Sequence, residues 1–396
     1  MSNTTGLPRR LAVLTAGLAA CLAGLVVTAP EPQAASSAAP TSAPGVVPAA
    51  ARTPDHYTPR PRALFNKPTG TRAQQYRLFT HINRSINSSP RGSVIRIAVF
   101  SFSDLRTADN LIRAHRRGVH VRLVFDDHEV YDAERKLQRA LGRNPRHRSF
   151  AILCEKSCRG TGGEMHAKVY MFGRAGRAKR VTMVGSNNMT SHNAERQWSD
   201  LLTLTNNKRM YATFRTWFRQ LKRDRPVTHP RIARLAGANL ALITPQDQER
   251  YGDPALRALA PVRCPSATRR TRVLISAHAW YGPRGMHIAR RVATLARRGC
   301  VVRVFHGEAF GTEIHRVLKD AGARFRTSRH PGVKTHQKLL IVRGAYGGND
   351  KAAFVWTGSH NWSPWALKLD DVILRSSRRR VVDAYTRHFI YMFHHA

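Results

Sequence analysis

The sequence predicts an α/β protein built from two similar lobes, each an α/β sandwich, with the functional site between them. A strand, helix, strand order covers residues 94–125 and returns at residues 272–305. Each copy is followed by two apolar runs separated by a charged, glycine-rich turn, as in a β-hairpin, at residues 169–184 and 339–356. Because the order of elements recurs more clearly than the residues themselves, we interpret the chain as an internal duplication.

The first lobe is expected to begin near residue 63. A helix carries the apolar positions of residues 76–86, and a buried strand follows over residues 94–102. The next helix covers residues 108–117, and a strand over residues 119–125 comes after it. Gly118 is expected to end this helix, because glycine readily takes the left-handed conformation that closes many helices.

The second lobe repeats this order. A strand is expected over residues 272–277, a helix over residues 286–298 that Gly299 ends, and a strand over residues 301–305. We interpret residues 234–248 as the linker between the lobes. The predicted boundary between the lobes therefore falls at residues 240 and 241.

Both lobes are expected to end in the same way, with an apolar strand and an amphipathic helix. The strands cover residues 201–204 and 372–374, and the helices cover residues 210–221 and 381–393. Aromatic residues recur along both helices at helical spacing. This spacing favours core packing over a role as ligand platforms.

Two short motifs occur once in each half. The first places a His and a Lys two residues apart, and the second is Gly-Ser-x-Asn. Their polar residues are His166, Lys168, Ser186 and Asn188 in the first half and His336, Lys338, Ser359 and Asn361 in the second. Residues two apart share one face of a strand, so each His and Lys point the same way if the segment is extended. The predicted hairpins bring the Ser and Asn of each half beside its His and Lys.

This set of side chains suits a phosphodiester. Lys and Asn donate hydrogen bonds to non-bridging oxygens, and His can attack phosphorus or carry a proton near neutral pH. The paired motifs resemble those of the phospholipase D superfamily, whose signature is H-x-K followed by G-S-x-N. The resemblance covers most of the chain after its N-terminal segment. The family usually has Asp at the seventh place after each His, where this chain has Gly173 and Arg343.

The resemblance implies catalysis through a phosphohistidine. His166 is expected to be the nucleophile and His336 the general acid and base, while the two lysines and two asparagines bind the substrate phosphate. Ser186 and Ser359 are counted with the substrate-binding residues and are expected to shape the turns and to hydrogen-bond the imidazole region. No cofactor is implied, and the sequence has no His-Glu-x-x-His motif or carboxylate-rich loop that would suggest a metal.

Two acidic residues are expected to orient the imidazoles. The family places an acid shortly after G-S-x-N, and Asp200 and Asp371 are nearest to that place here, each just before an apolar strand. A carboxylate that accepts from one ring nitrogen fixes the tautomer of a histidine. Both residues could instead be ordinary acids at strand ends.

The N-terminal residues suggest export. Arg9 and Arg10 precede an apolar run over residues 11–27, a pattern typical of a signal peptide, which we place at residues 1–35. A membrane anchor or a lipid attached at Cys21 are the alternatives. Residues 36–62, rich in Ala, Pro and Ser, are expected to be a flexible linker before the lobes at 63–240 and 241–396.

Four cysteines remain after the predicted signal peptide. An even number in an exported chain favours disulfides, and pairing within each lobe would join Cys154 to Cys158 and Cys264 to Cys300. A zinc site formed by Cys154, Cys158 and a nearby His is the competing interpretation.

Composition indicates an anionic partner. The chain of 396 residues has 66 Lys and Arg against 24 Asp and Glu, a formal net charge of +42. Such a charge attracts nucleic acids, phosphorylated polymers and acidic membrane surfaces. We expect a secreted, monomeric phospholipase D-type phosphodiesterase acting on glycerophospholipids. A secreted metal-independent nuclease and a binding protein without turnover are the alternatives.

Overall fold

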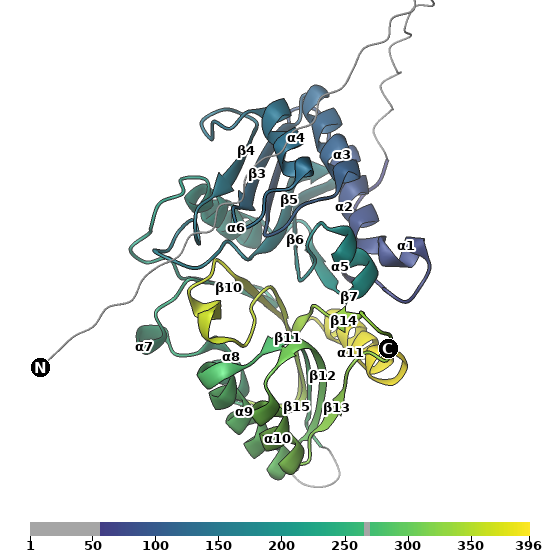
Figure 1. Cartoon of the computed structure of the whole chain (residues 1–396), viewed down its shortest axis with the longest axis vertical. Helices are drawn as coiled ribbons and strands as arrows, with labels where there is room; N and C mark the ends of the chain where they lie inside the picture. Colours follow the sequence, from purple (N-terminus) through teal and green to yellow (C-terminus); the bar gives the residue numbers. More distant parts are fainter. Residues whose placement is uncertain (1–55, 265–269) are drawn as a thin grey trace, which may run out of the picture. The chain divides into compact units, whose positions relative to one another are not determined.

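The computed structural model describes residues 56–264 and 270–396, which belong to one compact unit. The predicted signal peptide and most of the predicted linker lie outside the described residues. In the described part of the chain, no helix has the length and hydropathy needed to cross a membrane. Two large sheets and the helices around them confirm the predicted α/β class (Figure 1).

The first sheet has seven strands in the order β1-β8-β6-β5-β2-β3-β4. They are β1 (Arg62–Phe65), β2 (Val94–Val99), β3 (His120–Asp126), β4 (Phe150–Cys154), β5 (Lys168–Ala175), β6 (Ala178–Gly185) and β8 (Asp200–Leu204). Strands β2, β3 and β4 are parallel, whereas β5, β6, β8 and β1 pair antiparallel. Three helices cover one face (Figure 1): α2 (Arg77–Asn87), α3 (Leu105–Arg116) and α4 (Asp132–Leu141).

The second sheet has eight strands in the order β13-β12-β11-β15-β16-β17-β10-β9. They are β9 (Ile232–Ala236), β10 (Asn239–Ile243), β11 (Arg272–Trp280), β12 (Val301–Phe310), β13 (Arg324–Arg326), β15 (Lys338–Tyr346), β16 (Asn349–Gly358) and β17 (Val372–Ser376). Helices α8 (Pro254–Leu259), α9 (Gly282–Arg297) and α10 (Thr312–Asp320) pack on its outer face. The predicted hairpins are therefore present in both lobes, as β5 with β6 and β15 with β16.

One helix begins earlier than the sequence predicts, because a capping residue sets its start. Helix α3 begins three residues earlier than expected because Asp104 caps it, accepting a hydrogen bond from the backbone N–H of Thr107 at 2.8 Å. Its end agrees with the sequence, since Gly118 follows with φ of 88°.

The segment expected to link the lobes instead forms a hairpin. Strands β9 and β10 pair with each other, and β10 also pairs with β17, so the second sheet begins at Ile232 and the expected boundary at residues 240 and 241 falls inside the hairpin. Gly237 takes φ of 61° in the two-residue turn, a conformation that such turns require. Strand β9 was not predicted because its central residues, Arg234 among them, are exposed and interrupt the apolar pattern of a strand.

Two helices join the lobes through a shared core. Helices α6 (Lys208–Leu221) and α11 (Arg379–His395) contribute buried aromatic residues to one cluster that also contains inner-face residues of both sheets. Phe214, Trp217, Tyr385 and Phe389 are fully buried, which confirms that these aromatics form core. Tyr391 is the exception, with 38% of its surface exposed.

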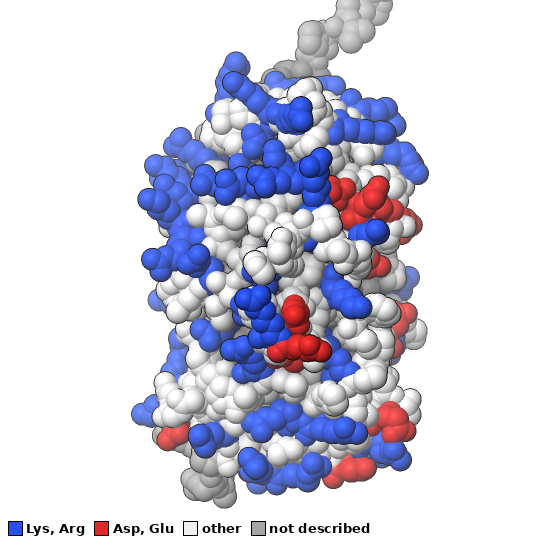
Figure 2. All heavy atoms as spheres, turned by 90° about the vertical axis from the view of Figure 1, so that its left-hand side faces the viewer, with Lys and Arg blue, Asp and Glu red and all other residues white. Residues whose placement is uncertain are grey.

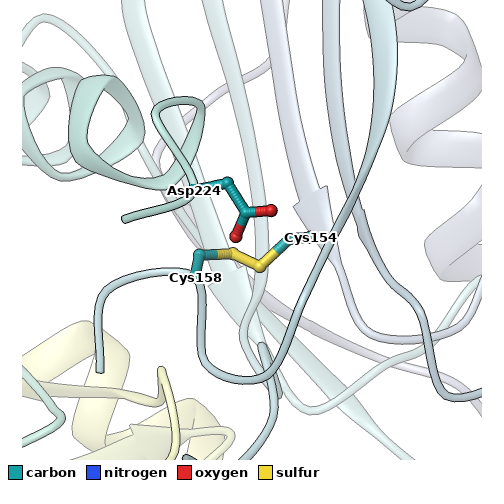
Figure 3. Close-up of side chains that lie close together, drawn as sticks. All are labelled: Cys154, Cys158 and Asp224. Carbon is teal, nitrogen blue, oxygen red and sulfur yellow. A yellow bond between two sulfur atoms is a disulfide. The ribbon is translucent and has the colours of Figure 1, made fainter. Parts of the chain in front are cut away.

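The predicted disulfides are present. Cys154 and Cys158 are bonded with their Cα atoms 5.3 Å apart, and Cys264 and Cys300 with theirs 5.0 Å apart. The carboxylate of Asp224 lies beside the first disulfide, and no histidine takes that place in the close group of potential ligands (Figure 3). Because both sulfur atoms are in the disulfide, they are not thiolates that could bind zinc.

A buried arginine ties the loop after this disulfide to the second lobe. Arg159 is fully buried, and its Nε donates to Asp370 Oδ1 at 2.6 Å. The same guanidinium donates to the carbonyl oxygens of Pro230 and Thr244 and to Gln220 Oε1. Removing one partner of such a pair leaves the other charge buried and unpaired.

We expect Arg159→Met to lower the free energy of unfolding by about 3–5 kcal/mol, because Asp370 loses its partner. Denaturant unfolding followed by circular dichroism measures this loss. Arg316→Met is the matched control, since Arg316 pairs with Glu313 on the surface and the change should cost less than about 1 kcal/mol. Equal effects of the two substitutions would contradict the structural role of Arg159.

Candidate active site

The first His-Lys motif lies at the start of β5, against the second lobe. The backbone N–H of Met165 donates to the buried Asp126 Oδ2 at 2.6 Å, which fixes the approach to His166. His166 is buried, and its Nδ1 lies 2.9 Å from Asp371 Oδ1. Since Asp371 belongs to the second lobe, the orientation of this imidazole depends on both lobes.

The second His-Lys motif is held by backbone of the first lobe. Strands β7 (Gln197–Trp198) and β14 (Lys334–Thr335) pair in parallel, and the backbone N–H of His336 donates to Trp198 O at 2.9 Å. Nδ1 of His336 lies 2.7 Å from Ser186 O, and the amide of Asn193 is 3.4 Å away. Because a carbonyl oxygen only accepts, Nδ1 carries a proton and Nε2 is the free nitrogen.

The two G-S-x-N turns have equivalent backbone geometry. The N–H of Ser186 donates to Asp200 O at 3.1 Å, and the N–H of Ser359 donates to Val372 O at 3.0 Å. Each serine hydroxyl accepts from the same partner residue, from Asp200 N at 3.1 Å and from Val372 N at 3.0 Å. A Cβ at Gly185 would lie 2.0 Å from Asp200 O, so only glycine allows this approach.

This register shows that the two predicted acids are not equivalent. Asp200 occupies the place of Val372, and the place of Asp371 in the first lobe is taken by Ser199. Asp200 Oδ1 accepts from the Ser186 hydroxyl at 2.8 Å. Its Oδ2 accepts from Thr357 Oγ1 and, at 2.7 Å, from the Tyr385 hydroxyl. In the described chain, hydrogen bonds therefore join Asp371 to a motif histidine and Asp200 to hydroxyl groups.

Two buried lysines make the centre of the site positive. Lys168 Nζ donates to His166 O, and Lys338 Nζ donates to His336 O at 2.7 Å. Burial lowers the pKa of Lys168 to about 7, and burial together with the charge of Lys168 lowers the pKa of Lys338 well below its ordinary value. A bound anion would favour the charged ammonium groups, so an oxyanion placed beside the pair would raise the pKa of both lysines.

The two motif asparagines are half-buried, and their Oδ1 atoms are buried without a hydrogen-bond partner. Asn188 and Asn361 show this in the same way, one in each lobe. Buried polar atoms are normally paired, and here an amide oxygen, which can only accept, is left unpaired at equivalent places of the two lobes. All eight motif residues thus lie around the junction of the lobes or support its turns.

Burial also keeps the imidazoles neutral. Burial and the charge of Lys168 lower the pKa of His166 to about 4, and burial with Lys338 lowers the pKa of His336 well below its ordinary value. Although burial alone would raise the pKa of Asp371, the neighbouring His166 holds it below the usual range. Asp371 is therefore ionised and can stabilise an imidazolium at His166.

Sequence reasoning did not find the aromatic ring beside His166. Phe100 packs edge-on against the His166 ring with centroids 4.9 Å apart, and Lys168 Nζ lies 4.7 Å from the Phe100 ring centre. The other face of Phe100 stacks on His128 at 3.8 Å. A phenylalanine directly after a buried strand gives no signal in the sequence that separates this role from core packing.

His360, inside the second G-S-x-N motif, forms a further layer behind Asp371. Its Nδ1 lies 3.7 Å from Asp371 Oδ2, and its Nε2 lies 2.9 Å from Arg284 Nη2. Arg284 in turn donates from Nε to Asp253 Oδ2 at 2.5 Å. Since a guanidinium only donates, Nε2 of His360 accepts and its neutral ring carries the proton on Nδ1, toward Asp371.

The places where the family's Asp is missing lie away from this centre. Gly173 lies on β5, beyond Lys168, and a Cβ there would make ordinary contacts at 3.5 Å with Val94. Arg343 lies on β15 and pairs with Asp383 of helix α11. Neither residue contacts the motif side chains, so the departure from the family pattern affects the supporting strands.

We expect tungstate, an oxyanion that stays doubly charged across this range, to bind more weakly as pH rises from about 7 to 9. Above pH 7 the free Lys168 loses its proton, whereas the complex needs the ammonium, so binding takes up a proton and the dissociation constant rises by up to about tenfold per pH unit. Isothermal titration calorimetry measures this. Lys168→Met should flatten the dependence, while Lys351→Met, at an exposed position on β16, should leave it unchanged; a pH-independent affinity would exclude this lysine centre.

Comparisons with known proteins agree with this geometry. A family model described as cardiolipin synthase, PLD-like domain, matches residues 82–222 and 266–393, more than half of the chain. No curated protein sequence matches it. A phosphatidylserine synthase from Haemophilus influenzae has a similar structure at 11% identity, with a TM-score of 0.57, covering 87% of this chain and 90% of that one.

A polyphosphate kinase from Porphyromonas gingivalis is similar at 12% identity, with a TM-score of 0.54 over 84% of this chain. This chain spans about half of the kinase, since the match covers 50% of that protein. At these identities the two structures show a shared fold. The matching family model, together with the duplicated motifs that meet between the lobes, shows that the chain belongs to the phospholipase D superfamily.

Proposed function

We propose that this protein is a secreted phospholipase D-type phosphodiesterase that cleaves phosphodiester bonds through a phosphohistidine at His166. The observation that carries the proposal is the pair of buried lysines, Lys168 and Lys338, each two residues from a histidine whose Nδ1 atom is engaged, so that a bound phosphate would meet two amines and two oriented imidazoles. Such a centre matches a phosphate with one negative charge. Each lobe supplies half of it.

In the first step, Nε2 of His166 attacks phosphorus while its Nδ1–H donates to Asp371. A P–N bond forms and the P–O bond to the leaving group breaks. His336 donates a proton from Nε2 to the leaving oxygen, since its Nδ1–H is held by Ser186 O. The approach of the anionic phosphate raises the pKa of His336, which allows it to carry this proton.

In the second step, His336 takes a proton from water through Nε2, and the hydroxide oxygen attacks phosphorus. The P–N bond to His166 breaks, and the second product leaves. Lys168, Lys338, Asn188 and Asn361 stabilise the additional charge on the pentacoordinate phosphorus in both steps. Preorganised donors of this kind are a major source of catalysis because they need not reorient during the reaction.

The unequal contacts of the histidines favour this assignment of roles. The ionised Asp371 stabilises the positive imidazole ring of the phosphohistidine at His166, whereas the carbonyl of Ser186 offers His336 a weaker, neutral acceptor. A neutral acceptor stabilises the protonated imidazole less than a carboxylate does, so His336 gives up its proton more easily.

We expect Asp371→Asn to lower kcat by roughly 10²–10⁴-fold, because the imidazolium-like intermediate loses its counter-charge. Asp200→Asn is the matched comparison: it removes a buried acid that contacts hydroxyl groups, so it should lower thermal stability more than it lowers kcat. Initial rates and thermal unfolding of both variants test this. If Asp200→Asn lost as much kcat as Asp371→Asn while staying folded, the assignment of Asp371 alone would be wrong.

The substrate we propose is a glycerophospholipid, from which the head group is released. The predicted signal peptide and the two disulfides support an extracellular enzyme. Export, and a chain longer than the minimal single-motif nucleases of this superfamily, favour lipid. The basic surface attracts anionic lipid as well as nucleic acid.

A secreted nuclease is the second candidate, favoured by the distribution of charge. Figure 2 shows Lys and Arg over the whole height of one face, with Asp and Glu in a few small groups. One open groove of about 580 Å³ is lined by Pro145 and by five basic residues, Arg146, Arg219, Lys222, Arg223 and Arg225. Such a groove can follow a phosphate backbone without reading its sequence.

The deciding experiment offers the mature protein phosphatidylcholine vesicles and plasmid DNA in parallel, with EDTA present. We expect release of choline that is lost in His166→Ala and in His336→Ala, with little change in thermal stability. Cleavage of DNA alone would identify the nuclease instead. Silence on both substrates would favour a binding protein, and a His variant with near-normal rates would overturn the two-histidine mechanism.

A further inference from the structure

A second pocket opens on the outer face of the second sheet, at the strands farthest from α9 and α10. Its volume is about 280 Å³, close to the lower end of the range for small-molecule sites. The apolar part of the wall consists of Ala233, Leu240, Leu242, Tyr346, Trp356 and Ile373. Cross-strand pairing sets Leu240 beside Arg375 and Leu242 beside Ile373, so the sheet itself forms the floor.

Three guanidinium groups also line this pocket: Arg231, Arg257 and Arg375. Among the described residues, no ion pair joins any of them to a carboxylate. Arg231 lies over the Tyr251 ring at 4.5 Å, and Arg257 donates to the Tyr251 carbonyl oxygen at 2.7 Å. The pocket therefore combines an apolar floor with three positive charges that the protein does not neutralise.

Buried polar atoms without partners mark the same place. The Nε atoms of Arg231 and Arg375 and the Oε1 atom of Gln246 are buried and make no hydrogen bond. Gln246 is only 9% exposed. Since buried donors are costly to leave unpaired, the two Nε–H groups around this pocket point to a ligand with acceptor oxygens, whereas Gln246 Oε1 is itself an acceptor and does not indicate such a ligand.

The duplication supplies an internal comparison. When the two lobes are aligned on their G-S-x-N turns, Arg375 of the second lobe is equivalent to Thr203 of the first. Arg375 pairs across the sheet with Trp356, and Thr203 pairs with Met183 in the same way. Thr203 is buried under α2, whose His81 contacts its hydroxyl at 2.9 Å. Among the described residues of the second lobe, the helices before β11 are the short α7 (Gln248–Tyr251) and α8, and the pocket lies where α2 covers the first sheet.

We propose that this pocket binds a single-chain amphiphilic anion, with its alkyl chain on the sheet floor and its phosphate or carboxylate head against the three arginines. The apolar floor excludes a small hydrated anion as the preferred ligand, and the unneutralised charge excludes a neutral chain. This site is separate from the two-histidine centre, and the inference does not depend on which phosphodiester that centre cleaves.

The pocket adjoins the catalytic residues through a smaller cavity. Pro254, Ala258, Trp356 and Ile373 line both, and the smaller cavity also reaches Lys338, Thr357 and His360. An amphiphile in the pocket would thus lie one layer of side chains from the catalytic lysine.

The test is isothermal titration of the mature protein with decyl phosphate and decanoate below their micelle concentrations. Arg375→Gln removes one charge of the pocket, and Ala233→Trp fills its mouth at an exposed position where folding tolerates a larger side chain. We expect each variant to weaken binding at one site by roughly tenfold or more, because charge-assisted hydrogen bonds and apolar contact are lost. Any anion held by the catalytic centre is common to all variants.

The controls separate the parts of the proposal. Arg234→Gln, exposed on β9 and outside the pocket, should bind as the wild type does. Decanol and inorganic phosphate should each bind at least tenfold more weakly than decyl phosphate. Binding of both decyl phosphate and decanoate would assign any such amphiphile, and binding of decyl phosphate alone would assign a phosphorylated one. Unchanged affinity in Arg375→Gln and Ala233→Trp would overturn the proposal, and so would inorganic phosphate that binds as tightly as decyl phosphate and is weakened by these two substitutions to the same degree.

Discussion

Burial of positive charge at the junction of the lobes is the constraint on which the site depends. Lys168 and Lys338 lie in a dry environment where each ammonium is unfavourable, yet two sheets, two interlobe helices and a shared core hold them there. Burying two lysine side chains lowers stability, so their presence indicates a functional role. In the function that we propose, the gain is an anion site whose attraction is not weakened by water, and the same burial lowers the pKa of both histidines.

The two halves of the chain contribute equivalent motifs to the site, but the acidic residues that follow these motifs have different contacts in each half. The G-S-x-N turns superpose in their hydrogen bonds, but the residues that follow them are offset by one. This offset directs one carboxylate to His166 and buries the other among hydroxyls. The lobes also differ in their helices, because the short α7 and α8 lie where α2 covers the first sheet and leave apolar residues and arginines of the second sheet uncovered. The duplication thus explains why both halves have the same turns, and the position of each acid along its strand explains why Asp371 and Asp200 have different partners.

Much of this could be predicted from the sequence because its signals are local. The hairpins, the order of elements, the cysteine pairs and the motif residues follow from spacing and composition. Residue pairing between lobes could not be predicted in the same way: Asp200 and Asp371 look alike in sequence, and only the register of β8 and β17 distinguishes them. The hairpin of β9 and β10 was missed because the three central residues of β9 are exposed, one of them Arg234, and because β10 is a short run of apolar residues after Asn239, so neither strand alternates apolar and polar residues.

The offset between Ser199 and Asp371 also bears on how such a chain could have arisen. In a symmetric dimer of the first half alone, each imidazole would meet the surroundings that His336 meets now, with the carbonyl oxygen of Ser186 as acceptor, and no carboxylate would support either ring. A dimer of the second half alone would supply two carboxylates, one for each. The present halves are therefore no longer interchangeable, and the chain behaves as two different subunits joined covalently. Without the second half, the described structure would lose Asp371, the only counter-ion that reaches a motif histidine in it.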